Sequence, residues 1–235
     1  MGLLDIASTT MRGGERRIEI AAQNTVNSET PGYKARIAFS EVQSEANSST
    51  SDLNAPQVRF AHNNTQGAIF DTGEALDLAV DGTGYFLVRD GDNFSLTRAG
   101  KFGIAADGAL IDASGRILQL ASGGDATTST YALEILPDGT MMDGTSVMGT
   151  IGLFEHAQDS FGALGRALSA DEIADLGEAE NGEIRQAMLE RSNVTLSDEM
   201  VELMKAQRQI ESGAQIIRAY DQLLDRAINT FGRSG

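Results

Sequence analysis

Residues 196–231 read LSDEMVELMKAQRQIESGAQIIRAYDQLLDRAINTF, and the rest of the chain is organised around this stretch. Apolar residues recur in it every seven positions, at Leu203, Ile210, Ile217, Leu224 and Phe231, with Met200, Ala214 and Ile228 three or four positions away. It holds no proline and a single glycine, Gly213, so the pattern predicts one amphipathic helix that starts at the N-cap residue Ser197. Such a helix is roughly 54 Å long, and we expect its apolar seam to pack on something equally long.

The other end of the chain offers a partner for that helix. Leu4, Met11, Ile18 and Thr25 are also seven residues apart, and the small residues Ala7, Gly14 and Ala21 fill the positions between them. We expect this helix to end near Asn27, because Pro31 disfavours helical dihedrals at Thr30 and Pro31-Gly32 suits a type II turn. Two amphipathic helices on an ordinary core would also give such patterns. We favour a coiled coil of the two ends, since the heptads occur at the two ends and nowhere else.

Composition excludes several classes of protein. The chain of 235 residues has no cysteine, which excludes disulfides and thiolate metal sites, and it has no apolar run long enough to span a membrane. No signal peptide is recognised, so we expect either a cytoplasmic protein or export without a cleaved signal. Residues 31–195 carry −14 of the net charge of −16. An acidic middle of this kind repels nucleic acid and anionic lipid, so neither is expected as a partner.

The middle of the chain changes to a period of two. Leu76, Leu78 and Val80 alternate with other residues, and 85–88 and 94–97 flank Asp90-Gly91 as in a hairpin. Further short strands are predicted at 101–105, 109–112, 116–120, 131–136 and 150–154. Residues 44–52 are interpreted as a linker and 157–183 as a loop-rich segment in which Ser169 caps a short helix. The predicted fold class is α+β: paired terminal coiled-coil helices (1–32 and 192–235) with an inserted all-β domain of short antiparallel strands (33–191).

No motif in the sequence indicates catalysis. His62 and His156 are the only histidines, there is no Gly-x-Ser-x-Gly, and Gly82-Thr83-Gly84 lies between two strands, which favours a turn over a dinucleotide loop. Asp90-Gly91-Asp92 begins like a calcium loop but has Phe94 in the next ligand position. We therefore expect no enzyme activity, no catalytic residues, no cofactor and no metal.

Four segments resemble the bacterial flagellar rod and hook proteins. They are Asn24–Lys34 (NTVNSETPGYK), Leu76–Phe86 (LDLAVDGTGYF), 97–102 (TRAGKF, with Asp107-Gly108 behind it) and Gln186–Val194, and they occur in the family's order over nearly the whole chain. The residues that match the motifs are Asn24, Asn27, Thr30, Pro31, Gly32, Tyr33, Gly82, Gly84, Arg98, Gly100, Ser192 and Asn193. The chain departs from the family's pattern at Thr25, where a Leu is usual, and at Ala187, where a Gly is common.

The resemblance implies a structural subunit of the flagellar basal-body rod, the drive shaft that crosses the periplasm. Such proteins pass through the flagellar export apparatus uncleaved and polymerise helically with themselves and with other rod proteins, without inserting into the membrane. Subunit packing is expected at Leu4, Ala7, Met11, Ile18, Met200, Leu203, Ile210, Ala214, Ile217, Leu224 and Ile228. The length fits a proximal rod protein best, with a distal rod or hook-type protein second. From other classes, an exported adhesin-like binding module with coiled-coil ends and a hydrolase with an unrecognised site remain as alternatives.

Overall fold

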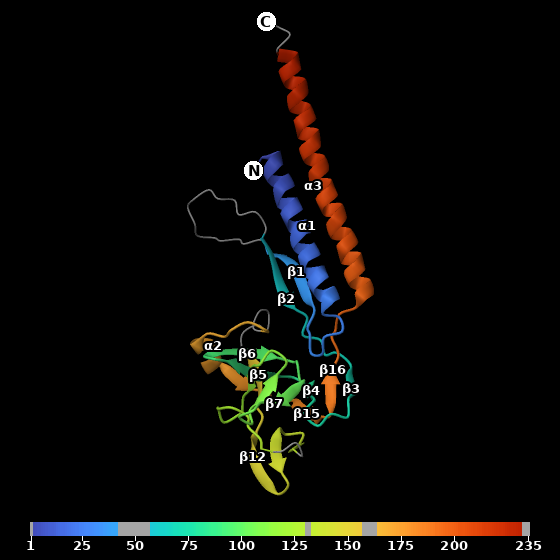
Figure 1. Ribbon diagram of the computed structural model, residues 1–235. Helices are drawn as coiled ribbons and strands as arrows, with labels where there is room; N and C mark the ends of the chain where they lie inside the picture. The colour runs from blue at the N-terminus through green and yellow to red at the C-terminus, as the bar shows by residue number, and fades with distance from the viewer. Residues whose placement is uncertain (1, 42–56, 130–132, 157–163, 232–235) are drawn as a thin grey trace. The chain divides into compact units, whose positions relative to one another are not determined.

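The computed structural model describes residues 2–41, 57–129, 133–156 and 164–231 (Figure 1). The chain divides into two units, and each is described by itself. Unit 1 comprises Met1–Val26, Arg36–Ala61 and Thr195–Gly235, and unit 2 comprises Asn27–Ala35 and His62–Val194. The predicted linker at 44–52 lies outside the described residues. Among the described residues no helix combines the length and the hydropathy that a membrane span requires.

Unit 1 consists of two long helices and a hairpin. Helix α1 spans Leu3–Val26 and α3 spans Leu196–Phe231, so a helix at each end of the chain is confirmed, and the strands β1 (Arg36–Glu41) and β2 (Gln57–His62) pair beside them. The expected N-cap was wrong by two residues: the amides of Asp198 and Glu199 both donate to the carbonyl of Thr195. Thr195 is as suitable a cap as Ser197, and it starts the helix earlier.

The two helices run antiparallel and approach closely through glycines. A Cβ on Gly14 would lie 2.6 Å from Ile210 Cγ1, and one on Gly213 would lie 2.5 Å from Met11 Cγ. The Gln209 side chain also donates to the carbonyl of Thr10 at 3.0 Å. The residues of α1 that are buried are mostly small: Ala7, Gly13, Gly14, Ile20, Ala21 and Asn24. Small residues therefore make the contact inside unit 1 and leave most of the large apolar side chains elsewhere.

Unit 2 is built from short antiparallel strands. The strands are β3 (Ile69–Asp71), β4 (Leu78–Gly82), β5 (Tyr85–Asp90), β6 (Asn93–Thr97), β7 (Phe102–Ile104), β8 (Leu110–Asp112), β9 (Ile117–Leu118), β10 (Leu133–Ile135), β11 (Thr140–Asp143), β12 (Ser146–Thr150), β13 (Leu153–His156), β14 (Leu176–Glu178), β15 (Gly182–Gln186) and β16 (Met188–Glu190). The largest sheet has the order β14-β13-β5-β9-β8-β7, with β6 also paired to β5. Three strands form β10-β11-β12, and the pairs β15-β4 and β16-β3 complete the unit.

Strand β5 lies at the centre of the core because both of its faces are buried. Phe86 and Val88 belong to the main cluster, where the Phe86 and Phe102 rings meet edge to face with centroids 5.6 Å apart. Tyr85 and Leu87 face a second, smaller cluster. Burial on both sides explains the continuous apolar run at 85–88. The main cluster comprises Leu78, Val80, Phe86, Val88, Phe102, Leu110, Leu118, Ala126, Leu133, Ile135, Met141, Ile151 and Ile184.

Residues 164–183, the described part of the predicted loop-rich segment 157–183, hold more regular structure than the sequence indicated. Ser169 caps helix α2 (Ala170–Ala174) with a capping box to Glu172, as expected. The loop interpretation was wrong at Leu176–Glu178, which is strand β14, and at Gly182, where β15 begins. Strand β14 lacks an alternating pattern because it is a short edge strand held by its pairing with β13.

Candidate functional site

Large apolar side chains lie exposed along both helices of unit 1. On α3, Met200, Met204, Leu223 and Ile228 are 60%, 54%, 62% and 68% exposed. Leu196, Val201 and Leu224 join them on α3, and Leu3, Leu4, Ile6 and Val26 do so on α1. On α3 they form two groups, one at the start of the helix (196–204) and one near its end (223–228). Groups of exposed apolar side chains are typical of an interaction surface.

The predicted packing residues fall into two groups in the structure. Ala7 is buried, and Met11, Ile18, Leu203, Ile210, Ala214 and Ile217 are partly buried within unit 1. Leu4, Met200, Leu224 and Ile228 are exposed. The heptad pattern thus combined residues that serve the contact between α1 and α3 with residues that α1 does not cover. Leu224 and Ile228 continue the side of α3 that carries Ile210 and Ile217, but α3 extends past the N-terminal end of α1 there (Figure 1). Only the second group is free to contact another subunit without rearrangement of unit 1.

A buried ionic cluster lies in unit 2. Glu190, Lys34 and Arg98 are 1%, 3% and 4% exposed. Lys34 Nζ lies 2.6 Å from Glu190 Oε1, and Arg98 NH1 lies 3.2 Å from Glu190 Oε2. The amide of Gly67 donates to Glu190 Oε1 at 2.7 Å. Both cations also donate to main-chain carbonyls, Lys34 to Thr65, and Arg98 to Val80 and Gly82. One carboxylate therefore faces two cations, and the cluster carries a net charge of +1.

Burial controls the electrostatics of this cluster. It lowers the pKa of the Lys34 ammonium, although the hydrogen bond from Lys34 to Glu190 opposes the shift. Burial also raises the pKa of the Tyr85 hydroxyl, whose ring lies 5.0 Å from the Arg98 guanidinium carbon. Within the described part of the chain, the buried Nε of Arg98 has no hydrogen-bond acceptor.

The four motif segments meet around this cluster. In the first, the Tyr33 amide donates to the Thr30 carbonyl and Gly32 has φ 71°, which confirms the predicted turn. A Cβ on Gly32 would lie 2.2 Å from the carbonyl oxygen of Arg98, in the third motif, so only glycine fits there. In the second motif, the carbonyl of Gly82 accepts from Arg98.

The fourth motif holds the segment that enters unit 2 against the one that leaves it. The Asn193 side chain accepts from the Ala35 amide at 2.7 Å and donates to the carbonyls of Asn63 and Thr65. The Glu190 carbonyl accepts from the Gly32 amide at 2.8 Å. Entry and exit segments are therefore bonded together through side chains and main chain.

The remaining motif residues hold turns or crossings. Asn27 accepts from Thr30, and Ser192 accepts from the Val194 amide. Gly84 has φ 93°, and a Cβ on Gly100 would lie 1.6 Å from the carbonyl oxygen of Leu78. Pro31 completes the 30–33 turn. Asn24 belongs to unit 1, where its side chain bonds both main-chain groups of Arg36 and donates to Glu199.

Sequence patterns alone gave no reason to single out Lys34 and Glu190. Both stand inside quoted motifs, but a charged residue at the edge of a motif usually indicates solvent exposure. The two are 156 residues apart, so no local pattern links them. The order of the motifs was the one available signal, because it indicates that the segments of Lys34 and Glu190 belong to the same motif set of one fold.

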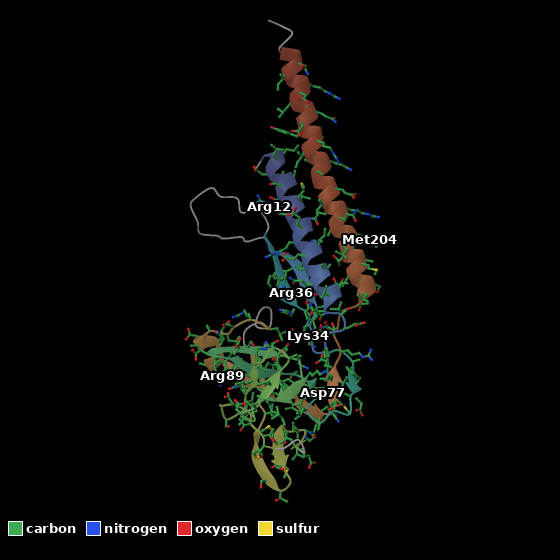
Figure 2. The ribbon with its side chains drawn as sticks, viewed as in Figure 1. Arg12, Lys34, Arg36, Asp77, Arg89 and Met204 are labelled. Carbon is green, nitrogen blue, oxygen red and sulfur yellow. The ribbon has the colours of Figure 1, made fainter. Side chains whose placement is uncertain are left out.

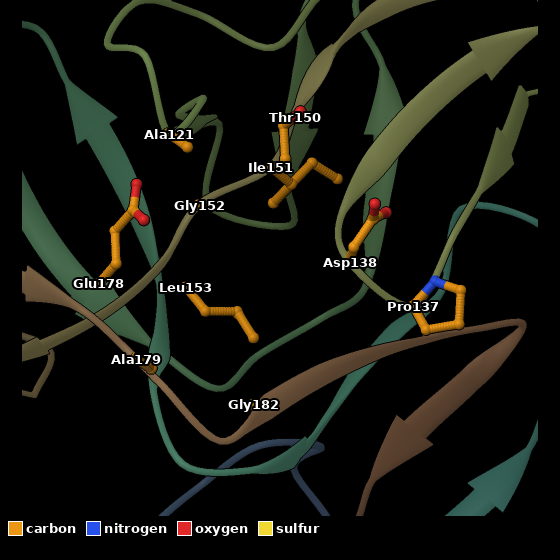
Figure 3. A pocket seen from close by; sticks show the side chains of 10 residues that line it. All are labelled: Ala121, Pro137, Asp138, Thr150, Ile151, Gly152, Leu153, Glu178, Ala179 and Gly182. Carbon is orange, nitrogen blue, oxygen red and sulfur yellow. The ribbon is translucent and has the colours of Figure 1, made fainter.

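Two hollows open on unit 2. One, of about 170 Å³, is lined by Pro31, Tyr33, Leu96, Ala99 and Leu164 among others, with Lys34 and Arg98 at its wall. The other, of about 140 Å³, has the carboxylates of Asp138 and Glu178 on opposite sides (Figure 3). The described residues contain no group of three or more His, Asp or Glu side chains that could hold a metal ion.

Comparison with known proteins matches both the C-terminal helix and the strands. Residues 185–230 match the family model "Flagellar basal body rod FlgEFG protein C-terminal", and residues 79–147 match "Flagellar hook protein FlgE/F/G D1 domain". The chain is 28% identical to flagellar basal-body rod protein FlgG of Bacillus subtilis (93% of this chain, 95% of the relative). It is also 28% identical to flagellar basal-body rod protein FlgF of Caulobacter vibrioides (93% of each chain). A flagellar hook protein FlgE of Brucella abortus is 35% identical, over 53% of this chain and 32% of the hook protein.

The chain has a helix at each end and antiparallel strands between them, and it matches two models of flagellar axial proteins. Together these features indicate a flagellar axial protein. Within that class, the matched models and the curated relatives support a flagellar basal-body rod family protein. This is a family of structural proteins, which agrees with the expectation of no enzyme activity.

Proposed function

We propose that this protein is a structural subunit of the flagellar basal-body rod and polymerises helically through the outward faces of α1 and α3. The observation that carries the proposal is the group of exposed apolar side chains near the end of α3, Leu223, Leu224 and Ile228. The small residues of α1 already occupy the contact with α3. The large apolar side chains that this contact does not cover are available to other subunits.

We further propose that α1 and α3 take part in a coiled coil. The close approach at Gly14 and Gly213 supports a long antiparallel α1–α3 contact, and the heptad spacing from Leu203 to Leu224 supports continuation of α3 against neighbouring helices. Partners are further copies of this chain and other rod proteins. Contacts that differ on the two sides of each subunit give an open helical polymer.

The proposal includes export through the flagellar apparatus without cleavage, and a place in the periplasmic part of the rod. Its support is the similarity of the chain to flagellar basal-body rod proteins. The relatives bear two different rod-protein names, FlgG and FlgF, and the proximal position is proposed on chain length. Intact-mass measurement of the subunit in isolated basal bodies tests the export claim, since loss of an N-terminal segment of signal-peptide length would contradict it.

Leu224→Asp tests assembly apart from folding. Leu224 is 45% exposed, so the change leaves the packing of unit 1 intact but buries an unpaired carboxylate in any helix contact made by this face. We expect normal expression and an unchanged circular dichroism spectrum, loss of the subunit from isolated rods, and non-motile cells.

The matched control is Gln222→Asp. Gln222 is exposed and lies about 200° around the helix from Leu224, so it introduces the same charge on the opposite face. Rods that incorporate Leu224→Asp as efficiently as Gln222→Asp would show that the group of exposed apolar side chains near the end of α3 is not a subunit contact.

A further inference from the structure

The tip of the β11–β12 hairpin is an anomaly of unit 2. Among the large apolar side chains of unit 2 that the structure describes, Val147 and Met148 alone are exposed, at 65% and 40%. The other exposed large apolar residues belong to unit 1. Strand β12 is an edge strand of its three-stranded sheet and contains no charged residue that would discourage a partner. Two exposed apolar side chains at consecutive positions of this uncharged strand indicate a contact with another surface.

The apolar hollow of unit 2 is a receptor of matching character. Pro31, Tyr33, Leu96 and Leu164 contribute to its walls, and its volume of about 170 Å³ suits one or two side chains rather than a whole element. Figure 1 places β12 at one end of unit 2, and Figure 2 labels Lys34, which lines the hollow, at the other end. The tip of one chain thus cannot reach its own hollow.

Charge also distinguishes the two hollows. The hairpin carries one acid, Asp143, while the apolar hollow is lined by Lys34 and Arg98 of the cluster with net charge +1. The second hollow presents Asp138 and Glu178 (Figure 3), which repel Asp143. It also lies on residues that directly follow β12.

We propose that the β11–β12 tip of one subunit inserts into the apolar hollow of unit 2 in the next copy of this chain. This inference rests on the proposed function, because only a polymer presents one unit 2 to another. The β11–β12 tip and the apolar hollow are different surfaces of the subunit. The contact is therefore heterologous and propagates along a polymer instead of closing a dimer. It is separate from the contacts of the terminal helices and gives unit 2 its own part in the assembly.

Disulfide cross-linking tests the contact directly, because the chain has no cysteine. Full-length subunit carrying Val147→Cys and Ala99→Cys is expressed in place of the native protein, and rods are isolated and oxidised. Ala99 lines the hollow and is partly exposed. We expect a ladder of cross-linked subunits that a reductant collapses. Val147→Cys with Ser114→Cys, at an exposed turn, serves as the control and should give none.

The outcomes separate this inference from the proposed function. Rods that contain the Ala99/Val147 cysteine pair but yield no ladder overturn the tip contact and leave the rod function standing. A ladder from Val147→Cys with Ala179→Cys instead moves the contact to the acidic hollow and also overturns it. Failure of the native chain to enter rods contradicts the proposed function itself.

A charge variant covers the case in which the cysteine pair does not assemble. Val147→Asp changes an exposed residue, so the subunit folds, and burial of the carboxylate weakens self-association by at least about tenfold in sedimentation velocity. An unchanged association constant for Val147→Asp overturns the inference.

Discussion

Glu190→Gln removes the single anion of the buried cluster and keeps its shape. Lys34 and Arg98 then lie buried without a counter-charge, because Glu190 pairs with both, at 2.6 and 3.2 Å. Removal of one partner from a buried ion pair costs about 3–5 kcal/mol. The glutamine oxygen can still accept from the Gly67 amide, so we expect a loss near the lower end, about 3 kcal/mol.

Urea unfolding followed by far-ultraviolet circular dichroism measures this loss, since the chain has no tryptophan. Hydrogen exchange at the Gly67 amide localises it, because that amide donates to Glu190. Glu183→Gln is the control: Glu183 makes an exposed pair with Arg185 at 3.3 Å, and its loss should cost about 0.5 kcal/mol or less.

The pH dependence of the stability of Glu190→Gln provides a second test. Burial already lowers the pKa of Lys34 in the folded protein below its unfolded value of 10.5. The charged form of Lys34 is therefore the costly one, and stability rises as pH increases through the folded pKa toward 10.5. Without Glu190 the folded pKa falls further, so Glu190→Gln should recover stability over a wider alkaline range than the native chain.

A double-mutant cycle completes the test. Lys34→Met removes one stranded cation, so Lys34→Met with Glu190→Gln should be less destabilised than the sum of the two single variants. If Glu190→Gln costs no more than Glu183→Gln, or if the cycle is additive, the cluster does not hold unit 2 together as described.

Three further predictions concern single positions. Gly14→Val should destabilise unit 1 by about 1–3 kcal/mol in thermal unfolding, because its side chain would enter Ile210, whereas Ala22→Val at an exposed position should cost far less. Ala187→Gly should stabilise unit 2 by about 0.5–1 kcal/mol in urea, because Ala187 holds φ 59° and only glycine adopts it without strain; a loss of stability would contradict this. Burial raises the pKa of Glu199 above 4.5, so its charged form is disfavoured in the folded state, and helix stability should fall as pH rises from 4.5 through the folded pKa. Glu199→Gln should flatten this pH dependence in thermal melts, and an identical slope would contradict the prediction.

Local signals predicted the local structure well. The heptads predicted α3 to within two residues at its start, Pro31-Gly32 predicted the 30–33 turn, and Asp90-Gly91 predicted the β5–β6 hairpin. The departure noted at Ala187 fits the structure, since the position has the left-handed φ that explains why glycine is common there.

Long-range features could not be predicted from such signals. The pairing of β4 with β15 joins Val80 to Ile184, and the ionic cluster joins Lys34 to Glu190; both depend on contacts more than 100 residues apart. A heptad also shows that a helix has an apolar stripe, but not which partner covers it. The predicted packing set therefore mixed Ile210, which meets Gly14 of the same chain, with Leu224, which is exposed.

The distribution of residue sizes in unit 1 connects the fold with assembly. Ala7, Gly14 and Ala21 bring α1 close to α3 but bury little apolar area, so the contact contributes little hydrophobic free energy. Ordering the backbone costs about 1–2 kcal/mol per residue. In the proposed assembly, neighbouring subunits that cover the exposed apolar side chains would offset the rest of this cost. Unit 2 has its own apolar core and a buried cluster that joins its entry and exit segments. Under the proposed function, such a subunit keeps a stable body in unit 2, while its terminal helices gain their final stability from the proposed polymer.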